Sequence, residues 1–327
     1  MIKLFKEVNN KLQCINDQEK IYEKIEKNMW IHIFDPSYEE ISKISEITKI
    51  DKEVLLSVMD EEESAHLDAD DDYTLIILDI PIYVNHIYET YPFVIIYNND
   101  YYVTLCKKET KLLDLMIKKF KRIEPHKHVR LTLQLMYRIS SNYITSLKYL
   151  NNKRQELENE IQSSMKNKDL LSLTKLNKSF IYFSTALNAN KVVFSKVKRL
   201  EEYKRYESDF ELMEDVEVEN NQAVEMCSIY RDILTNMIDA NASIISNNLN
   251  IVMKVLAVIT LIIEIPTLIA SIFGMNVELP FSKNEHGFII IISISSVLAI
   301  IGGLLLHFFT SKPIIKEKKN KRKKKLK

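Results

Sequence analysis

Two apolar stretches near the C-terminus, IVMKVLAVITLIIEIPTLIASIF (Ile251–Phe273) and FIIIISISSVLAIIGGLLLHFF (Phe288–Phe309), decide the fold of this 327-residue chain. Each is at least as long as the roughly 20 apolar residues that a helix needs to cross a bilayer. Because a backbone in lipid must satisfy its own hydrogen bonds, both stretches are predicted to be transmembrane helices. The first is assigned residues 251–276, the second residues 288–309, and an external loop over residues 277–287 joins them.

Glycine occurs only in the last quarter of the chain, and this favours long helices in the rest. The four glycines are Gly274, Gly287, Gly302 and Gly303. A region without glycine has few left-handed turns and few helix caps of the usual kind. The cysteines are few and scattered, as is typical of a reducing compartment. They are Cys14, Cys106 and Cys227.

Charge is unevenly distributed along the chain. Of its 45 basic and 45 acidic residues, ten bases and one acid (Glu317) follow Phe309, so residues 1–309 sum to −9. A basic run is compatible with nucleic-acid binding. Here it directly follows a membrane segment, where cytoplasmic retention of positive charge and anionic lipid headgroups explain it better. The basic tail, residues 310–327, therefore predicts a plasma-membrane protein with both termini in the cytoplasm, lipid as a partner and no nucleic acid.

Residues 1–107 have the mixed pattern of an α/β cytoplasmic domain. Met29–Phe34 reads as a strand, and Ser37 with Glu40 forms a capping box that opens a helix through about Ile47. Asp51 is expected to open another short helix, through Met59. Further strands are predicted from their Ile, Leu, Val and Tyr content, the last two joined as a hairpin. These strands are Thr74–Val84, Phe93–Tyr97 and Tyr101–Cys106.

Residues 108–250 are predicted to form a helical cytoplasmic region and a stalk, because their apolar residues recur at helical intervals. Turns are expected at Lys166–Asp169 and Tyr206–Asp209. One helix is then expected from about Phe210 to Asn276, a length of about 100 Å at 1.5 Å per residue. It would continue from the stalk into the first membrane span. The earlier helices are expected at Leu112–Arg122, Val129–Met165 and Leu170–Leu200.

A stripe of polar and small residues follows one face of the first membrane span. Steps of three and four keep its members on the same side of a helix. They are Asn250, Met253, Ala257, Thr260, Glu264, Thr267, Ser271 and Gly274. Such residues must face protein or water. One interpretation is packing between helices, where small residues are common. The other is a water-filled pore that several copies of the chain enclose, and Glu264 favours it.

The residues around Gly274-Met275-Asn276 resemble the CorA-type magnesium transporter family. The tripeptide ends the penultimate membrane helix, and Pro266-Thr267-Leu268-Ile269-Ala270 before it is similar to the family's first membrane helix. Met253-Lys254 and Phe273–Val277 belong to the same likeness. Trp30 with Asp35-Pro36-Ser37, and Tyr91–Ile96, resemble the family's cytoplasmic domain, so the resemblance covers essentially the whole chain.

The resemblance implies a homopentameric funnel with an α/β/α cytoplasmic domain and a pore-lining stalk helix. It assigns Gly274, Met275 and Asn276 to ion selection at the external mouth, where Gly274 would permit a close backbone turn. Magnesium dehydrates reluctantly, so neutral oxygens such as that of Asn276 suit binding through its waters. By the same likeness, Met253, Leu256 and Ala257 would form an apolar constriction that blocks ions by dewetting.

Glu264 departs from the family, which usually has an apolar residue at this position. A carboxylate at membrane depth is costly and functional by default. We therefore expect a cation site or a pH-sensitive constriction there. The alternative is a protonated Glu264 that hydrogen-bonds to a serine of the second helix. The candidate serines are Ser293, Ser295 and Ser296.

Acidic clusters supply candidates for regulation. In the family, acids at subunit interfaces bind regulatory magnesium, which holds the channel shut when the ion is plentiful. Asp215 on the stalk resembles one such ligand, and Asp60 is the candidate for its mate. A solvated acidic surface is the alternative for each of them.

The sequence thus predicts a potential-driven magnesium channel that also passes cobalt or nickel, with Mg²⁺ as both cargo and regulator. Zinc transport by the same architecture is one alternative, and a membrane-anchored scaffold or sensor without ion flux is another. No Walker lysine, nucleophile elbow or metal-ligand spacing occurs. We therefore expect that the protein is not an enzyme, has no organic cofactor and is not an ATP-driven pump.

Overall fold

The computed structural model describes the chain except residues 10, 17–19, 58–59, 61–62, 71, 164–166, 276–285 and 312–327. Its residues divide into two compact units, Met1–Ile238 and Asp239–Lys327. The predicted α/β part and most of the helical part therefore pack as one unit, and a boundary at residue 107 does not separate them.

A seven-stranded sheet forms the centre of the first unit, with the order β2-β1-β3-β7-β6-β5-β4. β3 and β7 are parallel, and every other neighbouring pair is antiparallel. The strands are β1 (Ile2–Val8), β2 (Lys11–Ile15), β3 (Trp30–Phe34), β4 (His66–Ala69), β5 (Thr74–Val84), β6 (Ile87–Tyr97) and β7 (Tyr102–Cys106).

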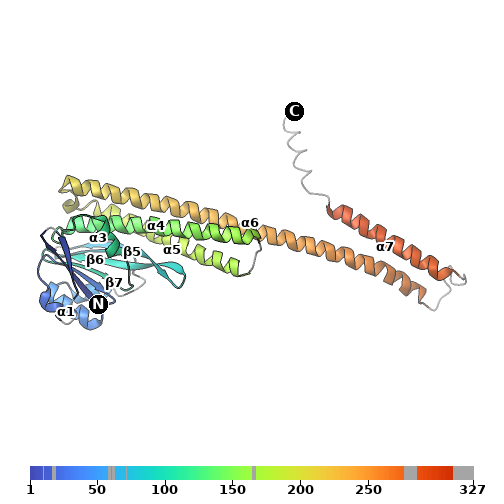
Figure 1. The fold of residues 1–327 in the computed structure, drawn as a ribbon, viewed down its shortest axis with the longest axis horizontal. Helices are drawn as coiled ribbons and strands as arrows, with labels where there is room; N and C mark the ends of the chain where they lie inside the picture. Colours follow the sequence, from blue (N-terminus) through green and yellow to red (C-terminus); the bar gives the residue numbers. More distant parts are fainter. Residues whose placement is uncertain are drawn as a thin grey trace, which may run out of the picture. The chain divides into compact units, whose positions relative to one another are not determined.

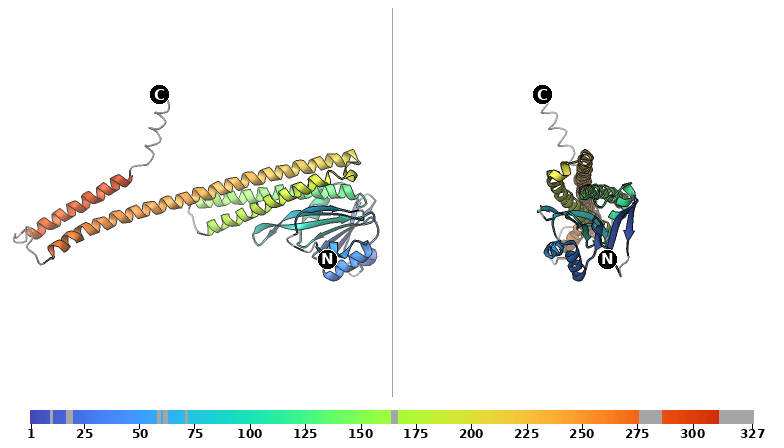
Figure 2. Two further views of the ribbon diagram at one scale, coloured as in Figure 1. Left: turned by 180° about the vertical axis from the view of Figure 1, so that it is seen from behind. Right: turned by 90° about the vertical axis from the view of Figure 1, so that its left-hand side faces the viewer.

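Helices cover both faces of the sheet, which confirms the α/β/α arrangement (Figures 1 and 2). One face carries the short helices α1 (Tyr38–Thr48) and α2 (Lys52–Ser57). The other carries α3 (Leu112–Lys119), α4 (His128–Ser163), α5 (Asn167–Val197) and the first part of α6. Two short 3₁₀ helices, η1 and η2, complete the unit at Tyr22–Lys24 and Glu201–Lys204.

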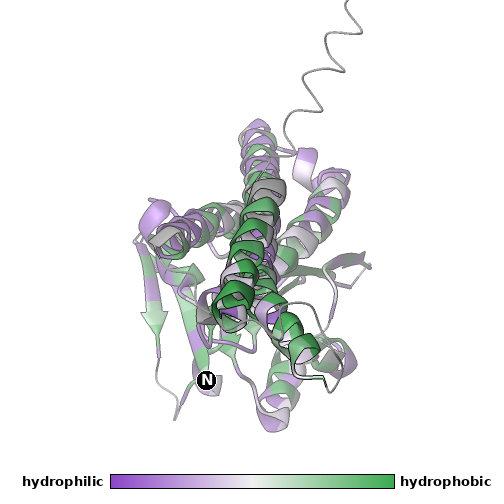
Figure 3. Ribbon diagram, turned by 90° about the vertical axis from the view of Figure 1, so that its right-hand side faces the viewer, coloured by the Kyte–Doolittle hydropathy of each residue, from purple (hydrophilic) through white to green (hydrophobic). Residues whose placement is uncertain are grey.

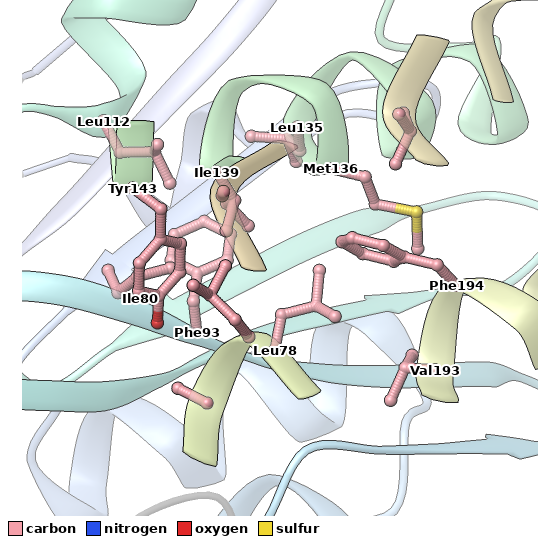
Figure 4. Close-up of a cluster of buried hydrophobic side chains, with 14 of the residues drawn as sticks. Leu78, Ile80, Phe93, Leu112, Leu135, Met136, Ile139, Tyr143, Val193 and Phe194 are labelled. Carbon is pink, nitrogen blue, oxygen red and sulfur yellow. The ribbon is translucent and has the colours of Figure 1, made fainter. Parts of the chain in front are cut away.

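The two cores alternate along the strands because successive side chains of a strand point to opposite faces. Leu75 and Ile77 of β5 pack with α1, whereas Ile76 and Leu78 pack with the long helices. Figure 4 shows part of the core on the side of the long helices, where Leu78 lies among side chains of α4 and α5. This double burial explains why β5 reads as an almost continuous apolar run.

Helix α5 also binds the sheet where β5 and β6 extend beyond their shorter neighbours. The Asn190 amide accepts from the backbone N–H of Asp79 at 2.9 Å and donates to its carbonyl at 2.8 Å. Tyr143 donates to the same carbonyl at 3.1 Å. Ser179 accepts from the backbone N–H of Tyr88 at 2.9 Å. Side chains from α4 and α5 thus satisfy backbone groups that have no neighbouring strand, as burial requires.

Most predicted elements are confirmed, and several boundaries are corrected. The Ser37–Glu40 capping box is present, and β5 has the predicted bounds. The expected turn at Tyr206–Asp209 is wrong beyond its first residue, because α6 already begins at Glu207. α5 begins at Asn167, so the expected turn at Lys166–Asp169 is also wrong in its last three residues. Met59 lies outside the residues that the structure describes.

The second unit contains the end of α6 (Glu207–Phe273) and α7 (Gly287–Ser311). The predicted continuous helix from stalk to membrane span is confirmed, and no residue of its most apolar window is buried inside the chain. α7 has a second apolar window, of which 17% is buried inside the chain. Figure 3 colours both regions predominantly as hydrophobic. Residues 277–285 of the predicted external loop and 312–327 of the basic tail lie outside the described part, and Gly287 is already helical.

We predict that acid destabilises the first unit through His32. This side chain is 5% exposed, and its Nδ1 lies 3.0 Å from the Thr104 hydroxyl. Burial lowers the pKa of His32 to about 3. The unfolded chain therefore binds an extra proton below pH 6.5, so the free energy of unfolding should fall by about 2 kcal/mol between pH 7 and pH 5.

Thermal unfolding of the full-length protein in detergent at a series of pH values measures this loss. The control is His32→Asn, which keeps a polar atom near Thr104 and removes the ionisable ring. Its pH slope should be shallower than that of the wild type, and an identical slope would show that other groups cause the acid loss.

Candidate functional site

The polar stripe of α6 is an open face of the helix. All eight of its residues from Asn250 to Gly274, and Leu256 beside them, are exposed. Met253 and Leu256 of the predicted constriction are 67% and 62% exposed. A single chain therefore leaves this face uncovered from the predicted inner end of the span to the tripeptide.

α7 covers a different face of α6. The half-buried α6 residues include Val258, Leu261 and Ile265, and these three lie on average about 110° around the helix from the centre of the stripe at 3.6 residues per turn. The contact is close, because a Cβ added at Gly302 would meet Ile265 at 3.1 Å and one at Gly303 would meet Ile262 at 3.3 Å. On the α7 side, Gly302 and Gly303 make this contact, and the buried residues one and two turns before them, Ala299 and Ser295, are also small.

The stripe is therefore not the surface that joins the two helices of one chain. Glu264 is exposed on the stripe, whereas Ser295 is buried and its hydroxyl has no hydrogen-bond partner among the described residues. Ser293 and Ser296 are exposed. The expected alternative of a Glu264–serine hydrogen bond within the chain thus finds no support in the described span. What remains for the stripe is water or another copy of the chain.

Two threonines of the stripe use their protons inside their own helix. Thr260 donates to the carbonyl of Leu256 at 2.9 Å, and Thr267 donates to that of Ile263 at 2.7 Å. A hydroxyl has one proton and two lone pairs, so each oxygen keeps only acceptor capacity for an outside partner. An ionised Glu264 carboxylate is also acceptor-only. Such a surface suits donors, and the waters around a cation are donors.

The tripeptide begins where α6 ends. The N–H of Gly274 donates to Ala270 at 2.9 Å and that of Met275 to Ile272 at 3.2 Å, so these residues close the last helical turn. Gly274 does not have a positive φ, and an added Cβ would meet only ordinary contacts at 3.4 and 3.5 Å. The described backbone therefore shows no feature of Gly274 that requires glycine, and its expected role in a close backbone turn at the external mouth stays a prediction. Asn276 lies outside the described residues.

The two candidate regulatory acids are both on the surface. Asp215 lies on the exposed side of α6. Met213 and Val216, on the other side of the helix, are buried in the core. Asp60 is exposed in the segment between α2 and β4. The nearby Glu217 forms an ion pair with Lys198 at 2.6 Å and is thereby partly neutralised. The assignment of Asp215 and Asp60 to a metal site between subunits stays a prediction.

A group of metal-type ligands that the sequence did not reveal lies in the first unit. Glu7, Glu124 and His126 have ligand atoms within 4.8 Å of one another. The Glu124 carboxylate, however, already forms ion pairs with Arg122 at 3.0 Å and with Lys127 at 3.1 Å, both through the same oxygen. These cations compete with a metal ion for the same oxygen, so we interpret the group as an ion-pair cluster. No spacing signal could have found it, since Glu7 is over a hundred residues away in the sequence.

The cavity beside this cluster does not belong to the stripe. It has a volume of about 910 Å³ and is lined by the segment between α3 and α4, the β6–β7 turn and the start of α6. Its charged residues have both signs, with Arg130 paired to Asp209 at 2.7 Å. It therefore lacks the single-sign field that would select a charged ligand.

Comparisons with known proteins agree on one family. Residues 26–318 match the family described as CorA-like Mg²⁺ transporter protein. The cobalt/magnesium transport protein CorA of Methanocaldococcus jannaschii is 29% identical over 278 residues, which cover 84% of this chain and 88% of that protein. The complete structure of the CorA magnesium transporter of the same organism aligns with a TM-score of 0.79 at 24% identity, over 96% of this chain and 98% of that one.

A second full-length structure, that of the CmaX protein, aligns with a TM-score of 0.71 at 13% identity. The alignment covers 94% of this chain and 97% of that one. At these identities the structural likenesses show a shared fold, which includes the long helix and the helix after it.

We predict that Gly303→Leu disrupts the contact between α6 and α7, whereas Gly303→Ala is tolerated. An alanine Cβ would press on the flexible end of Ile262 at 3.3 Å, but a leucine side chain has no space there. Overpacking of this kind costs about 1–3 kcal/mol. Thermal unfolding in detergent and the yield of monodisperse protein measure the effect. Equal behaviour of the two variants would contradict the observed packing.

Proposed function

The chain belongs to the CorA-like Mg²⁺ transporter family, and from this premise we propose that it conducts magnesium ions across the cell membrane as a homopentameric channel. One observation carries the proposal: α6 has an uncovered face of hydrogen-bond acceptors along an otherwise apolar span. A membrane protein exposes polar groups only toward protein or water. Two helices cannot enclose a channel, so several copies must each contribute this face.

The chemistry of the face suits magnesium. Mg²⁺ keeps several of its waters, and these donate hydrogen bonds to surrounding oxygens. Thr260, Thr267 and the tripeptide's Asn276 would accept such bonds without binding the ion too tightly, because they are neutral. Asn276 would act at the external mouth, and Met253, Leu256 and Ala257 would form the apolar constriction near the inner end. The relative of 29% identity is named for cobalt and magnesium, which favours these cations over zinc.

The membrane potential would drive the ion inward. Moving one elementary charge across 100 mV corresponds to about 2.3 kcal/mol, and a divalent cation gains twice that. Both termini would lie in the cytoplasm, as the basic tail after α7 indicates. The family is one of transporters, so we propose no catalytic step and no organic cofactor. Cytoplasmic Mg²⁺ would regulate the channel through Asp215 and Asp60 at subunit interfaces.

Purified protein in liposomes should take up Mg²⁺ in response to an inside-negative potential, and Asn276→Ala should abolish most of this uptake. Loss of the amide removes the acceptor that holds the hydrated ion at the entrance. A fluorescent magnesium indicator inside the vesicles measures the flux. The matched control is Asn284→Ala, another asparagine of the same short segment, which should conduct normally. Absence of wild-type flux under a potential would instead support a scaffold or sensor.

Regulation predicts a second effect on flux. Asp215→Ala should weaken inhibition by Mg²⁺ on the cytoplasmic side, because a carboxylate ligand is lost. The same vesicles, loaded with increasing Mg²⁺, measure the concentration that halves uptake. Glu214→Ala provides a matched control, since Glu214 is the neighbouring exposed acid on α6. Equal inhibition of both variants and the wild type would remove Asp215 from the regulatory site.

A further inference from the structure

Glu264 is the one ionisable residue between Lys254 and Glu278, and α7 contributes none from Gly287 to Leu306. Residues 255–277 and 287–306 therefore contain no opposite charge for its side chain. It lies on the stripe, on the side that α7 leaves open. A carboxylate at this depth costs several kcal/mol against an apolar residue unless water or a cation accompanies it. We therefore expect Glu264 to have a water, cation or protein partner that offsets this cost.

The neighbours of Glu264 on this face are acceptors as well. Thr260 and Thr267 lie four and three residues away, which corresponds to about 6 and 4.5 Å along the helix axis. Both hydroxyl protons are held by carbonyls of α6. The three side chains thus form a continuous belt that can accept hydrogen bonds and has no proton to donate to a carboxylate. A belt of this kind repels anions and does not stabilise Glu264 by itself.

We propose that the Glu264 carboxylates of the assembled copies form a cation site inside the membrane that holds a divalent ion through its waters. The inference rests on the proposed function, since it needs the stripe to face a shared pore. The Thr260 and Thr267 rings lie on either side and accept the remaining water hydrogens. Each copy contributes one carboxylate, so the site is incomplete in a single chain.

Occupancy by a divalent ion would determine selectivity. A ring of carboxylates attracts a doubly charged ion about twice as strongly as a singly charged one at the same distance. The divalent ion therefore occupies the ring and excludes sodium and potassium from the same passage. Conduction continues when an ion entering at the mouth displaces the one ahead of it. The ring thus adds a charge-based selection step to the neutral acceptors of the external mouth.

The test compares wild type with Glu264→Gln in liposomes. The substitution keeps the shape and removes the charge. We expect the Mg²⁺ concentration for half-maximal uptake to rise roughly tenfold, because charge-assisted hydrogen bonds to the ion's waters are replaced by neutral ones. We also expect sodium flux to become measurable in the presence of millimolar Mg²⁺. Size-exclusion chromatography must show the same assembly for both proteins.

A second variant separates the position of the charge from its mere presence. Glu264→Gln combined with Thr267→Glu moves the carboxylate by about one turn along the same face and should restore the exclusion of sodium. If wild type conducts Mg²⁺ while Glu264→Gln keeps the same half-saturation and the same sodium exclusion, the ring is refuted and the channel stands. If wild type conducts nothing, the channel itself is refuted.

Discussion

The contact between α6 and α7 determines what the rest of the membrane unit can do. Gly302 and Gly303 allow α7 to approach Ile262 and Ile265 of α6, and this fixes which side of α6 is covered. Because α7 packs on that side, the polar stripe lies on a side of α6 that α7 does not cover. In a bilayer there is little hydrophobic force between helices, so small residues and close packing must hold them together. The selection of an open face is therefore a consequence of steric fit.

A single α-helix connects the two units, and its two parts use different faces. In the first unit Met213, Val216, Ala223 and Cys227 are buried against the core, whereas Asp215 remains at the surface. In the second unit the partly covered residues face α7, and the acceptors Thr260, Glu264 and Thr267 are exposed. One unbroken helix can present a buried face in the first unit and an acceptor face in the second, because its regular rotation per residue places residues of chosen spacing on any side.

Much of this could be predicted from the sequence, for identifiable reasons. β5, the capping box of α1 and the long α6 have strong local signals: β-branched runs, a Ser–Glu pair and a chain without glycine. β1, β2 and β4 have no such local signal, because they are short or polar strands whose positions depend on pairing with neighbours. The stripe follows from spacing alone, but its openness requires α7 in place. The Glu7–Glu124–His126 cluster depends on contacts between distant segments, which no local pattern encodes.

The bonds from Asn190 and Ser179 to the backbone of β5 and β6 have a consequence for the proposed assembly of identical copies. An unpaired strand edge invites strands of other molecules to add to it, and such growth does not close. α5 binds the N–H and the carbonyl of Asp79 and the N–H of Tyr88, and so removes three of the free backbone groups that such growth would use. Strand addition at this part of the hairpin is thereby disfavoured, whereas helical surfaces can form a finite, closed oligomer.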